Sequence, residues 1–287
     1  MRAAQITELN AAPQVVEVDG VAGFTIEAVA LNPLDVSVWS GVFYGGHPPL
    51  PYIPGCEAVG RSADGDRFYL FGEGRGVGRD GFLAERVDFP GGLALPLPVG
   101  TDPALGASSG IAGVAGWVPV AWKAKVAPGD RVLVLGGTGA VGQVAVQAAT
   151  LLGAELVVGV GRKDLDRIPD ELGPDGFTVC IDMVWGEPLA NALAHAARHA
   201  RIVHVGQSAG AQAPLRSADV RSKELVIQGH SNFALSLEDL QRAQLELLEH
   251  VAAGRIVIPV ERYPLDRVAE AWERQRSGPG GKVVVEL

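Results

Sequence analysis

The chain has 287 residues, 47% of them hydrophobic and 20% charged, as expected of a globular protein long enough for two domains. Its formal net charge of −9 argues against nucleic-acid binding, because phosphate contacts draw on clustered Lys and Arg. The two cysteines, Cys56 and Cys180, are too few for a disulfide framework and favour a reducing cytoplasm. The opening residues MRAAQITELN lack the apolar core of a signal peptide.

The stretch LVLGGTGAVGQVAVQAATLLGA, residues 133–154, carries no charged residue and is long enough to span a membrane. Its glycines gather at one end, however, and Gln143 and Gln147 interrupt the remainder. RVLVLG, residues 131–136, is typical of a strand buried on both faces, and the following residues have helical spacing up to Gly153. We therefore expect a strand, a tight turn and a helix, and no membrane span.

The glycines of this turn match the dinucleotide-binding pattern G-x-G-x-x-G, which carries weight between a strand and a helix. In that pattern the first glycine permits the turn, the second admits the pyrophosphate, and the third lets helix and strand pack closely. The alternative is a glycine-rich turn that binds nothing. The predicted cofactor contacts here are Gly137, Thr138, Gly139, Ala140, Val141 and Gly142.

Further apolar runs follow the motif at intervals. Residues 155–160, 177–185, 201–206 and 224–229 are predicted strands, and EPLANALAHAARHA, residues 187–200, is a predicted helix. Strands that alternate with helices predict an α/β fold with a doubly wound parallel sheet. Such a sheet binds its cofactor at the carboxyl ends of the strands.

The residues after the second strand bear on which dinucleotide binds. NAD sites carry an acid there, which holds the ribose 2′-hydroxyl. This chain has Gly161 followed by Arg162 and Lys163, which leaves room for a 2′-phosphate and supplies cations for it. We predict NADP(H) as the cofactor. The alternative is that the two cations merely solvate a loop. Asp164 could reach a ribose, but it lies beyond the end of the strand.

Several stretches together resemble one family. They are ALNPLDVSVWSGVF and PPLPYIPGCEAVG near the N-terminus, the strand–turn–helix segment in the middle, and AAGRIVIPVERYPLDRVAEAWERQRSGPGGKVVVEL at the end. In this order they resemble the medium-chain dehydrogenase/reductase superfamily, in its zinc-free quinone oxidoreductase and enoyl reductase branch. The resemblance implies a Rossmann-type domain, residues 108–251, inserted into a partly open, GroES-like β-barrel formed by residues 1–107 and 252–287. It also implies an active site between the domains and a homodimer joined through ELVIQGHSNF.

The resemblance further implies a reaction and its residues. In this branch hydride passes from NADPH to the β-carbon of a conjugated carbonyl compound (a quinone, an enone or an enoyl thioester). Tyr44 is the candidate proton donor, although Phe43 is an alternative for the aligned position and Tyr44 could simply pack. Asn32 and Asp35 match the family pattern NPxD, with Asp35 a candidate to brace a turn. The remaining implied contacts are Gly206, Gln207, Ser231 and Asn232 with the cofactor, and Lys282 at the cleft.

We expect no metal. Zinc-dependent relatives use Cys and His ligands, but NPLDV has no cysteine, and Cys56 replaces the histidine that precedes the glutamate. The four-cysteine structural lobe is missing from the sequence. His195 and His199 have a spacing that permits metal binding on one helix face, but no third ligand accompanies them.

The sequence departs from the family in length, since the segment from Glu57 to Gly81 is shorter than usual. Two interpretations therefore stay open. The chain is an NADPH-dependent reductase of a conjugated carbonyl, or it is a dinucleotide-binding member with little turnover that acts as a binding or structural protein. A short-chain dehydrogenase is excluded, because no tyrosine stands four residues before a lysine.

Overall fold

The computed structural model describes residues 1–161 and 163–287 and divides the chain into two compact units. Unit 1 comprises residues 1–112, 244–253 and 258–287, and unit 2 comprises residues 113–243 and 254–257. The division after residue 112 lies five residues beyond the expected one at 107. The C-terminal half of helix α8 (Leu237–Ala252) counts with unit 1, whereas the sequence placed it in the inserted domain.

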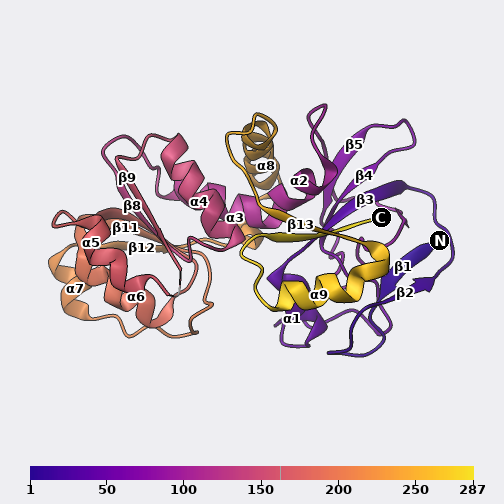
Figure 1. Cartoon of the computed structure of the whole chain (residues 1–287), viewed down its shortest axis with the longest axis horizontal. Coiled ribbons are helices and arrows are strands. Elements are labelled where there is room, and N and C mark those ends of the chain that lie inside the picture. The colour runs from indigo at the N-terminus through magenta and orange to yellow at the C-terminus, as the bar shows by residue number, and fades with distance from the viewer. Residues whose placement is uncertain (162) are drawn as a thin grey trace. The chain divides into compact units, whose positions relative to one another are not determined.

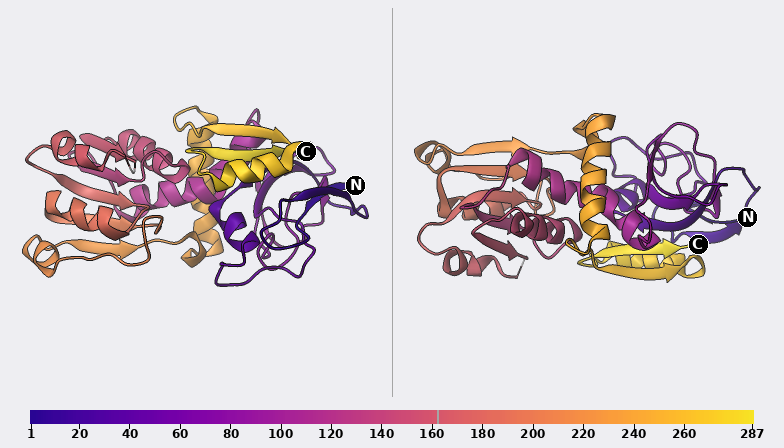
Figure 2. Two further views of the ribbon diagram at one scale, coloured as in Figure 1. Left: turned by 60° about the horizontal axis from the view of Figure 1, so that its bottom comes forward. Right: turned by 90° about the horizontal axis from the view of Figure 1, so that it is seen from above.

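Unit 2 is built on a parallel sheet, as the sequence predicted. The strand order is β12-β11-β10-β8-β9, and every neighbouring pair is parallel. The strands lie side by side in both views of Figure 2. Their bounds are β8 Arg131–Leu135, β9 Leu156–Val160, β10 Phe177–Asp182, β11 Ala196–His204 and β12 Val226–Gly229.

Helices cover both faces of this sheet, which explains why its central strands are apolar throughout. Helix α4 packs on β8 and β9 from one side, while α5 and α6 cover the other side (Figure 1). Leu133 and Leu135 point toward α5 and α6, and both are fully buried. The helical elements of this unit are α3 Val114–Val118, η2 Pro119–Lys123, α4 Ala140–Leu151, η3 Leu165–Arg167, α5 Ile168–Leu172, α6 Gly186–Ala192, η4 Leu193–His195, α7 Ser217–Ser222, η5 Asn232–Ala234 and the start of α8.

The connection between β9 and β10 is short. Among the described residues of this connection, 161 and 163–176, the helical elements are the turn η3 and the five-residue helix α5, and β10 begins at Phe177. The chain therefore passes directly from the second strand to the strand on the far side of β8, and β9 forms an edge of the sheet. Doubly wound dinucleotide-binding sheets commonly place a third strand beyond the second.

The predicted helix over residues 187–200 is wrong at its C-terminal end. Helix α6 and the turn η4 end at His195, and β11 begins at Ala196. His199 lies in that strand with a positive φ of 61°, its N–H donating to the Lys223 carbonyl. His195 and His199 thus do not share a helix face. Ala196, Ala200, Ile202 and Val203 are buried in the packing of the sheet, and this tertiary contact outweighs the helix propensity of alanine.

Unit 1 contains an open sheet of seven strands, mostly antiparallel. Its path runs β13-β14-β3-β4-β5-β7, with β6 paired to β3 and β1 paired separately to β2. The strand bounds are β1 Arg2–Gln5, β2 Gln14–Glu17, β3 Phe24–Leu31, β4 Glu57–Arg61, β5 Arg67–Phe71, β6 Arg86–Val87, β7 Leu93–Pro96, β13 Val260–Pro264 and β14 Lys282–Glu286. Strand β14 from the end of the chain pairs with β3 from its beginning, so both segments build one core.

Short helices close this core. Helix α1 (Pro33–Trp39) packs on α9 (Val268–Arg276), where the rings of Trp39 and Trp272 meet edge to face at 6.2 Å. Helix α9 in turn lies along β13 and β14, drawn in yellow in Figure 2. The remaining helical elements are α2 Pro103–Ser108, η1 Ser109–Gly113 and η6 Leu265–Arg267.

One helical run is long enough and apolar enough to cross a membrane, judged by length and composition alone. It extends over Pro103–Lys123, and 78% of its most apolar 18-residue stretch is buried inside the protein. It is also interrupted at Gly110, whose ψ of −108° is not helical. A buried core helix passes the same test.

Candidate functional site

The predicted cofactor residues collect at one edge of the unit 2 sheet. The strands are parallel, so all five carboxyl ends lie along the same edge, at Leu135, Val160, Asp182, His204 and Gly229. The glycine turn follows β8, Gly161 follows β9, Gly206 and Gln207 follow β11, and Ser231 and Asn232 follow β12. The chain changes direction across the sheet between β8 and β10, and this point is where such sheets bind ligands.

The glycine turn is tightly packed against its neighbours at two positions. A Cβ on Gly142 would stand 2.1 Å from the Gly136 carbonyl oxygen, and one on Gly137 would stand 2.7 Å from the Gly159 Cα. Both positions therefore require glycine for helix α4 and strand β9 to approach β8. The turn itself depends on Gly136, whose φ is +87°, and not on Gly137 as the sequence pattern suggested.

Gly139 differs from these two. It is the N-cap of α4, and a Cβ there would have only the Gly136 oxygen nearby, at 3.6 Å. The space above Gly139 is thus open, which is the arrangement a pyrophosphate needs to approach the backbone. The amides of Ala140 and Val141 begin the helix, where N–H groups lack intrahelical acceptors and the dipole favours an anion. This geometry fits a dinucleotide.

The structure describes two of the three predicted 2′-phosphate contacts. Gly161 is buried directly after β9, and Lys163 is exposed two residues further on. Arg162, the third predicted contact, lies outside the described residues. Asp164 is turned back toward Gly161: a Cβ on Gly161 would lie 3.3 Å from its Oδ2 atom and 2.9 Å from Thr138 Oγ1.

The loops after β11 and β12 carry the other predicted contacts. Gly206 leaves no space for a side chain, since a Cβ would stand 2.9 Å from the Met183 carbonyl oxygen. Asn232 Oδ1 lies 3.0 Å from His230 Nε2, and burial lowers the pKa of that imidazole. Gln207 and Ser231 lie in the same two loops. Whether these residues contact a cofactor stays a prediction.

The sequence reasoning missed a polar cluster at the same edge. Asp182, fully buried at the end of β10, accepts hydrogen bonds from the Val184 and Trp185 amides, each at 2.9 Å. Its second oxygen lies 3.1 Å from His204 Nδ1 at the end of β11. The Trp185 ring lies 4.2 Å from the His204 ring, and Trp185 has a positive φ of 60°. This cluster fixes the loop after β10; the available signal was the acid that ends the apolar run FTVCID.

A second buried polar cluster lies in unit 1, around Glu57. The Glu57 carboxylate is fully buried and accepts hydrogen bonds from Asn32 Nδ2 at 2.9 Å and Tyr69 Oη at 2.9 Å. The Ile111 amide donates to it at 2.6 Å. Lys282 Nζ, 2% exposed, lies 3.2 Å from the carboxylate and donates to Asn32 Oδ1 at 2.6 Å. The buried charge pair thus joins β4 to the last strand.

These contacts describe the three predicted catalytic residues. Asn32 is 1% exposed, and its side chain binds Glu57 and Lys282, so within the described residues it acts as a brace. Asp35 is also buried and accepts a hydrogen bond from the Asn32 amide at 2.8 Å, which holds the start of α1. Tyr44 is 88% exposed, with its ring 4.5 Å from Phe43. A catalytic role for any of them stays a prediction.

Cys56 lies beside Asp35 in the same unit. Burial raises the pKa of the Cys56 thiol well above its ordinary value, and the neighbouring Asp35 carboxylate acts in the same direction. Burial likewise raises the pKa of Asp35, against a hydrogen bond from the thiol. Across residues 1–161 and 163–287 no group of three His, Cys, Asp or Glu side chains could hold a metal ion.

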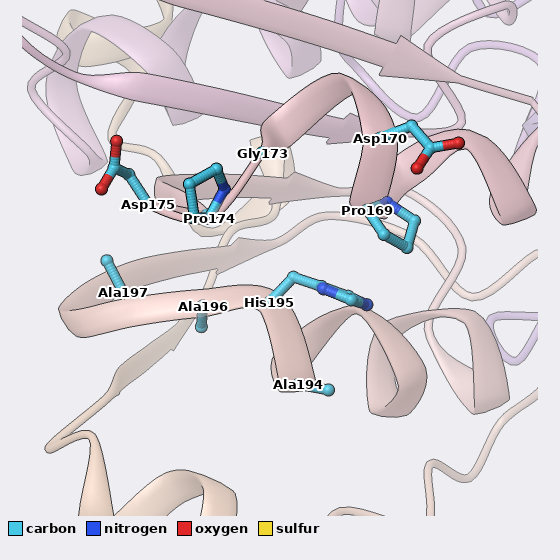
Figure 3. Close-up of a pocket in the computed structure, with 10 residues that line it drawn as sticks. Pro169, Asp170, Gly173, Pro174, Asp175, Ala194, His195, Ala196 and Ala197 are labelled. Atoms are coloured by element: carbon cyan, nitrogen blue, oxygen red, sulfur yellow. The ribbon is translucent and has the colours of Figure 1, made fainter.

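A surface cavity of about 560 Å³ lies at the opposite edge of the unit 2 sheet (Figure 3). Its walls are Pro169, Asp170 and residues 173–176 before β10, together with residues 194–197 around the start of β11, His195 among them. Because these are the amino ends of the strands, the cavity is separate from the edge that carries the glycine turn.

Comparison with known proteins agrees with this geometry. A quinone oxidoreductase from Lama guanicoe is 30% identical over 91% of this chain and 87% of its own length. The chain belongs to the medium-chain dehydrogenase/reductase superfamily, in its quinone oxidoreductase branch. Residues 152–285 also match the family description "Zinc-binding dehydrogenase". An oxidoreductase activity follows from this membership.

Solved structures of this superfamily share the fold over the whole chain. An NAD-dependent alcohol dehydrogenase superposes with a TM-score of 0.86 at 23% identity, covering 100% of both chains. The quinone oxidoreductase from Thermus thermophilus, solved also in complex with NADPH, superposes with a TM-score of 0.78 at 24% identity and the same coverage. The first of these structures is named for NAD, and the second was solved with NADPH.

Proposed function

We propose that the protein is an NADPH-dependent, zinc-independent reductase of a conjugated carbonyl compound, such as a quinone, an enone or an enoyl thioester. The observation that carries the proposal is the glycine turn before α4, which leaves open space at Gly139 on the ligand-binding edge of a parallel sheet. The names of the quinone oxidoreductase relatives support the acceptor class.

The residues of unit 2 would hold the dinucleotide. Ala140 and Val141 present their amides to the pyrophosphate, and Lys163 supplies a cation on the side of the adenosine ribose. Gly206, together with the loop after β12, lies on the half of the sheet that receives the nicotinamide. When bound, the dinucleotide supplies the hydride, and the protein supplies position and electrostatics.

The acceptor would be oriented without a metal. The exposed hydroxyl of Tyr44 is the group we assign to bind the carbonyl oxygen or to donate the proton that follows hydride transfer. Asn32 and Asp35 are buried in the packing of unit 1 and would act through it.

We also propose that the protein is a homodimer joined through β12. This strand is the edge of the unit 2 sheet on one side, and Val226 on it is 52% exposed. Light scattering on purified protein tests this, with Val226→Lys expected to yield monomers. A monomeric wild-type protein would contradict it.

The decisive experiment for the activity is a titration of the purified protein with NADPH and with NADH, followed by a panel of enones and quinones. We expect NADPH to bind more tightly than NADH and to be oxidised when an acceptor is present. Binding without oxidation of either dinucleotide across the panel would favour a binding or structural role. Binding of neither would refute the proposal.

A further inference from the structure

The space next to Gly161 is bordered by the side chains of Thr138 and Asp164. A Cβ on Gly161 would lie 2.9 Å from the Thr138 hydroxyl oxygen and 3.3 Å from the Asp164 carboxylate oxygen Oδ2. Thr138 comes from the glycine turn after β8 and Asp164 from the loop after β9. The two side chains therefore converge where NAD-binding sheets present the acid that reads the ribose 2′-hydroxyl.

Backbone and side-chain contacts hold Asp164 in this orientation. Its amide donates to the Gly161 carbonyl oxygen at 3.2 Å, which closes a turn directly after the strand. Its other carboxylate oxygen, Oδ1, lies 3.5 Å from Arg167 Nη1, and Arg167 also pairs with Glu171 on the next turn. The carboxylate thus contacts Arg167 through Oδ1, while Oδ2 lies beside Gly161.

An acid four residues beyond the end of a strand would ordinarily be too distant to contact the ribose. Here the hydrogen bond from the Asp164 amide to the Gly161 carbonyl oxygen brings it back, and because residue 161 is glycine, its own side chain does not displace the carboxylate from the strand end. A carboxylate so placed accepts a hydrogen bond from a 2′-hydroxyl and repels a 2′-phosphate.

We propose that Asp164 is a specificity-determining residue that opposes the 2′-phosphate and allows the protein to bind NADH as well as NADPH. The proposal rests on the dinucleotide binding proposed above and qualifies its preference for NADPH. Thr138 completes the ribose contact, and the cation of Lys163 acts in the opposite direction by attracting the phosphate. The balance of these groups gives the wild-type protein only a modest preference for NADPH over NADH.

The test is the dissociation constant of NADPH and of NADH, measured by calorimetry without any acceptor, for the wild type and for Asp164→Asn. The substitution keeps the shape of the side chain and removes its charge. We expect NADPH to bind about tenfold more tightly to the variant and NADH to bind equally or more weakly. A merely structural role of Asp164 would leave the ratio of the two dissociation constants unchanged.

Asp166→Asn is the matched control, since it removes the same charge from an exposed neighbour in η3. Equal changes in the two variants would overturn the proposal, because the effect would then be one of net charge. An unchanged ratio in Asp164→Asn would also overturn it, while leaving dinucleotide binding intact. Wild-type protein that binds neither dinucleotide would refute the proposed function as well.

Discussion

At the scale of single residues, Glu57 is a fully buried acid held by several partners in unit 1. Its carboxylate has no exposure and contacts one cation, Lys282, together with neutral donors from Asn32 and Tyr69. A buried charge stays favourable only while its partner is present. Glu57 and Lys282 therefore act as one pair, although 225 positions separate them in sequence.

Glu57→Gln should lower the free energy of unfolding by about 3 kcal/mol, because it leaves the Lys282 ammonium buried without its counter-charge. Chemical denaturation measures this. The double variant Glu57→Gln/Lys282→Met removes both charges and should recover a large part of the loss. A single variant as stable as the wild type would show that the pair contributes nothing to stability.

Tyr44→Phe tests the proposed proton donor. The variant keeps the ring against Phe43 and removes only the hydroxyl. We expect kcat with an accepted enone to fall about a hundredfold, with the dissociation constant of NADPH unchanged. Stopped-flow oxidation of NADPH is the measurement. Turnover equal to that of the wild type would eliminate Tyr44 as the donor.

Residue identity predicted some of this site and missed the rest. The glycine spacing located the turn, because Gly137 and Gly142 are required by contacts with β9 and Gly136. The braces around Glu57 were not predictable, since they unite residues distant in sequence whose pairing depends on the sheet register. Asp182 was missed because a single acid after an apolar run is common to many strand ends.

At the scale of elements, the strand–turn–helix formed by β8 and α4 contains one glycine that the packing requires and another that we assign to ligand binding. Gly142 faces the interior of the turn, where a Cβ would clash with the Gly136 carbonyl oxygen, whereas Gly139 faces open space. The two glycines belong to one motif but meet different demands.

Gly142→Ala should destabilise the protein by about 3 kcal/mol through overpacking. Gly139→Ala should cost less than about 1 kcal/mol. The second variant should nonetheless weaken NADPH binding about tenfold, because the new methyl group stands between the backbone and the pyrophosphate. Denaturation and calorimetry on both variants distinguish these effects. Similar losses of stability in the two would contradict the assignment of Gly139 to the ligand.

Elements were predicted best where burial makes their pattern continuous. Strands β8, β9 and β12 lie within a residue or two of the predicted runs. The signature is clearest for β8, whose residues 132–135 are all buried. The start of β11 was mistaken for helix, because ARHA has alanine content and helical spacing that the sheet overrides. The short connection from β9 to β10 was not recognised, because its length becomes meaningful only when the strand order is known.

At the scale of the whole molecule, membership in a superfamily described partly by zinc binding raises the question of metal. The described residues contain no set of three potential ligands, and Cys56 is held as a buried thiol beside Asp35. We expect elemental analysis of the purified protein to find well below one zinc per chain, and EDTA to leave the oxidation of NADPH unchanged. Stoichiometric zinc, or activity lost on chelation and restored by zinc, would contradict this expectation.

The pairing of β14 with β3 also bears on how the protein is made. Ribosomes release a chain from its N-terminus, so β3, β4 and Glu57 emerge long before Lys282, while the whole segment 113–243 of unit 2 is synthesised in between. Unit 1 therefore lacks the counter-charge of Glu57 until translation is nearly finished. Chains that stop before Lys282 should expose this half to proteases while unit 2 resists them, and limited proteolysis of a chain ending at Gly281 would reveal that order.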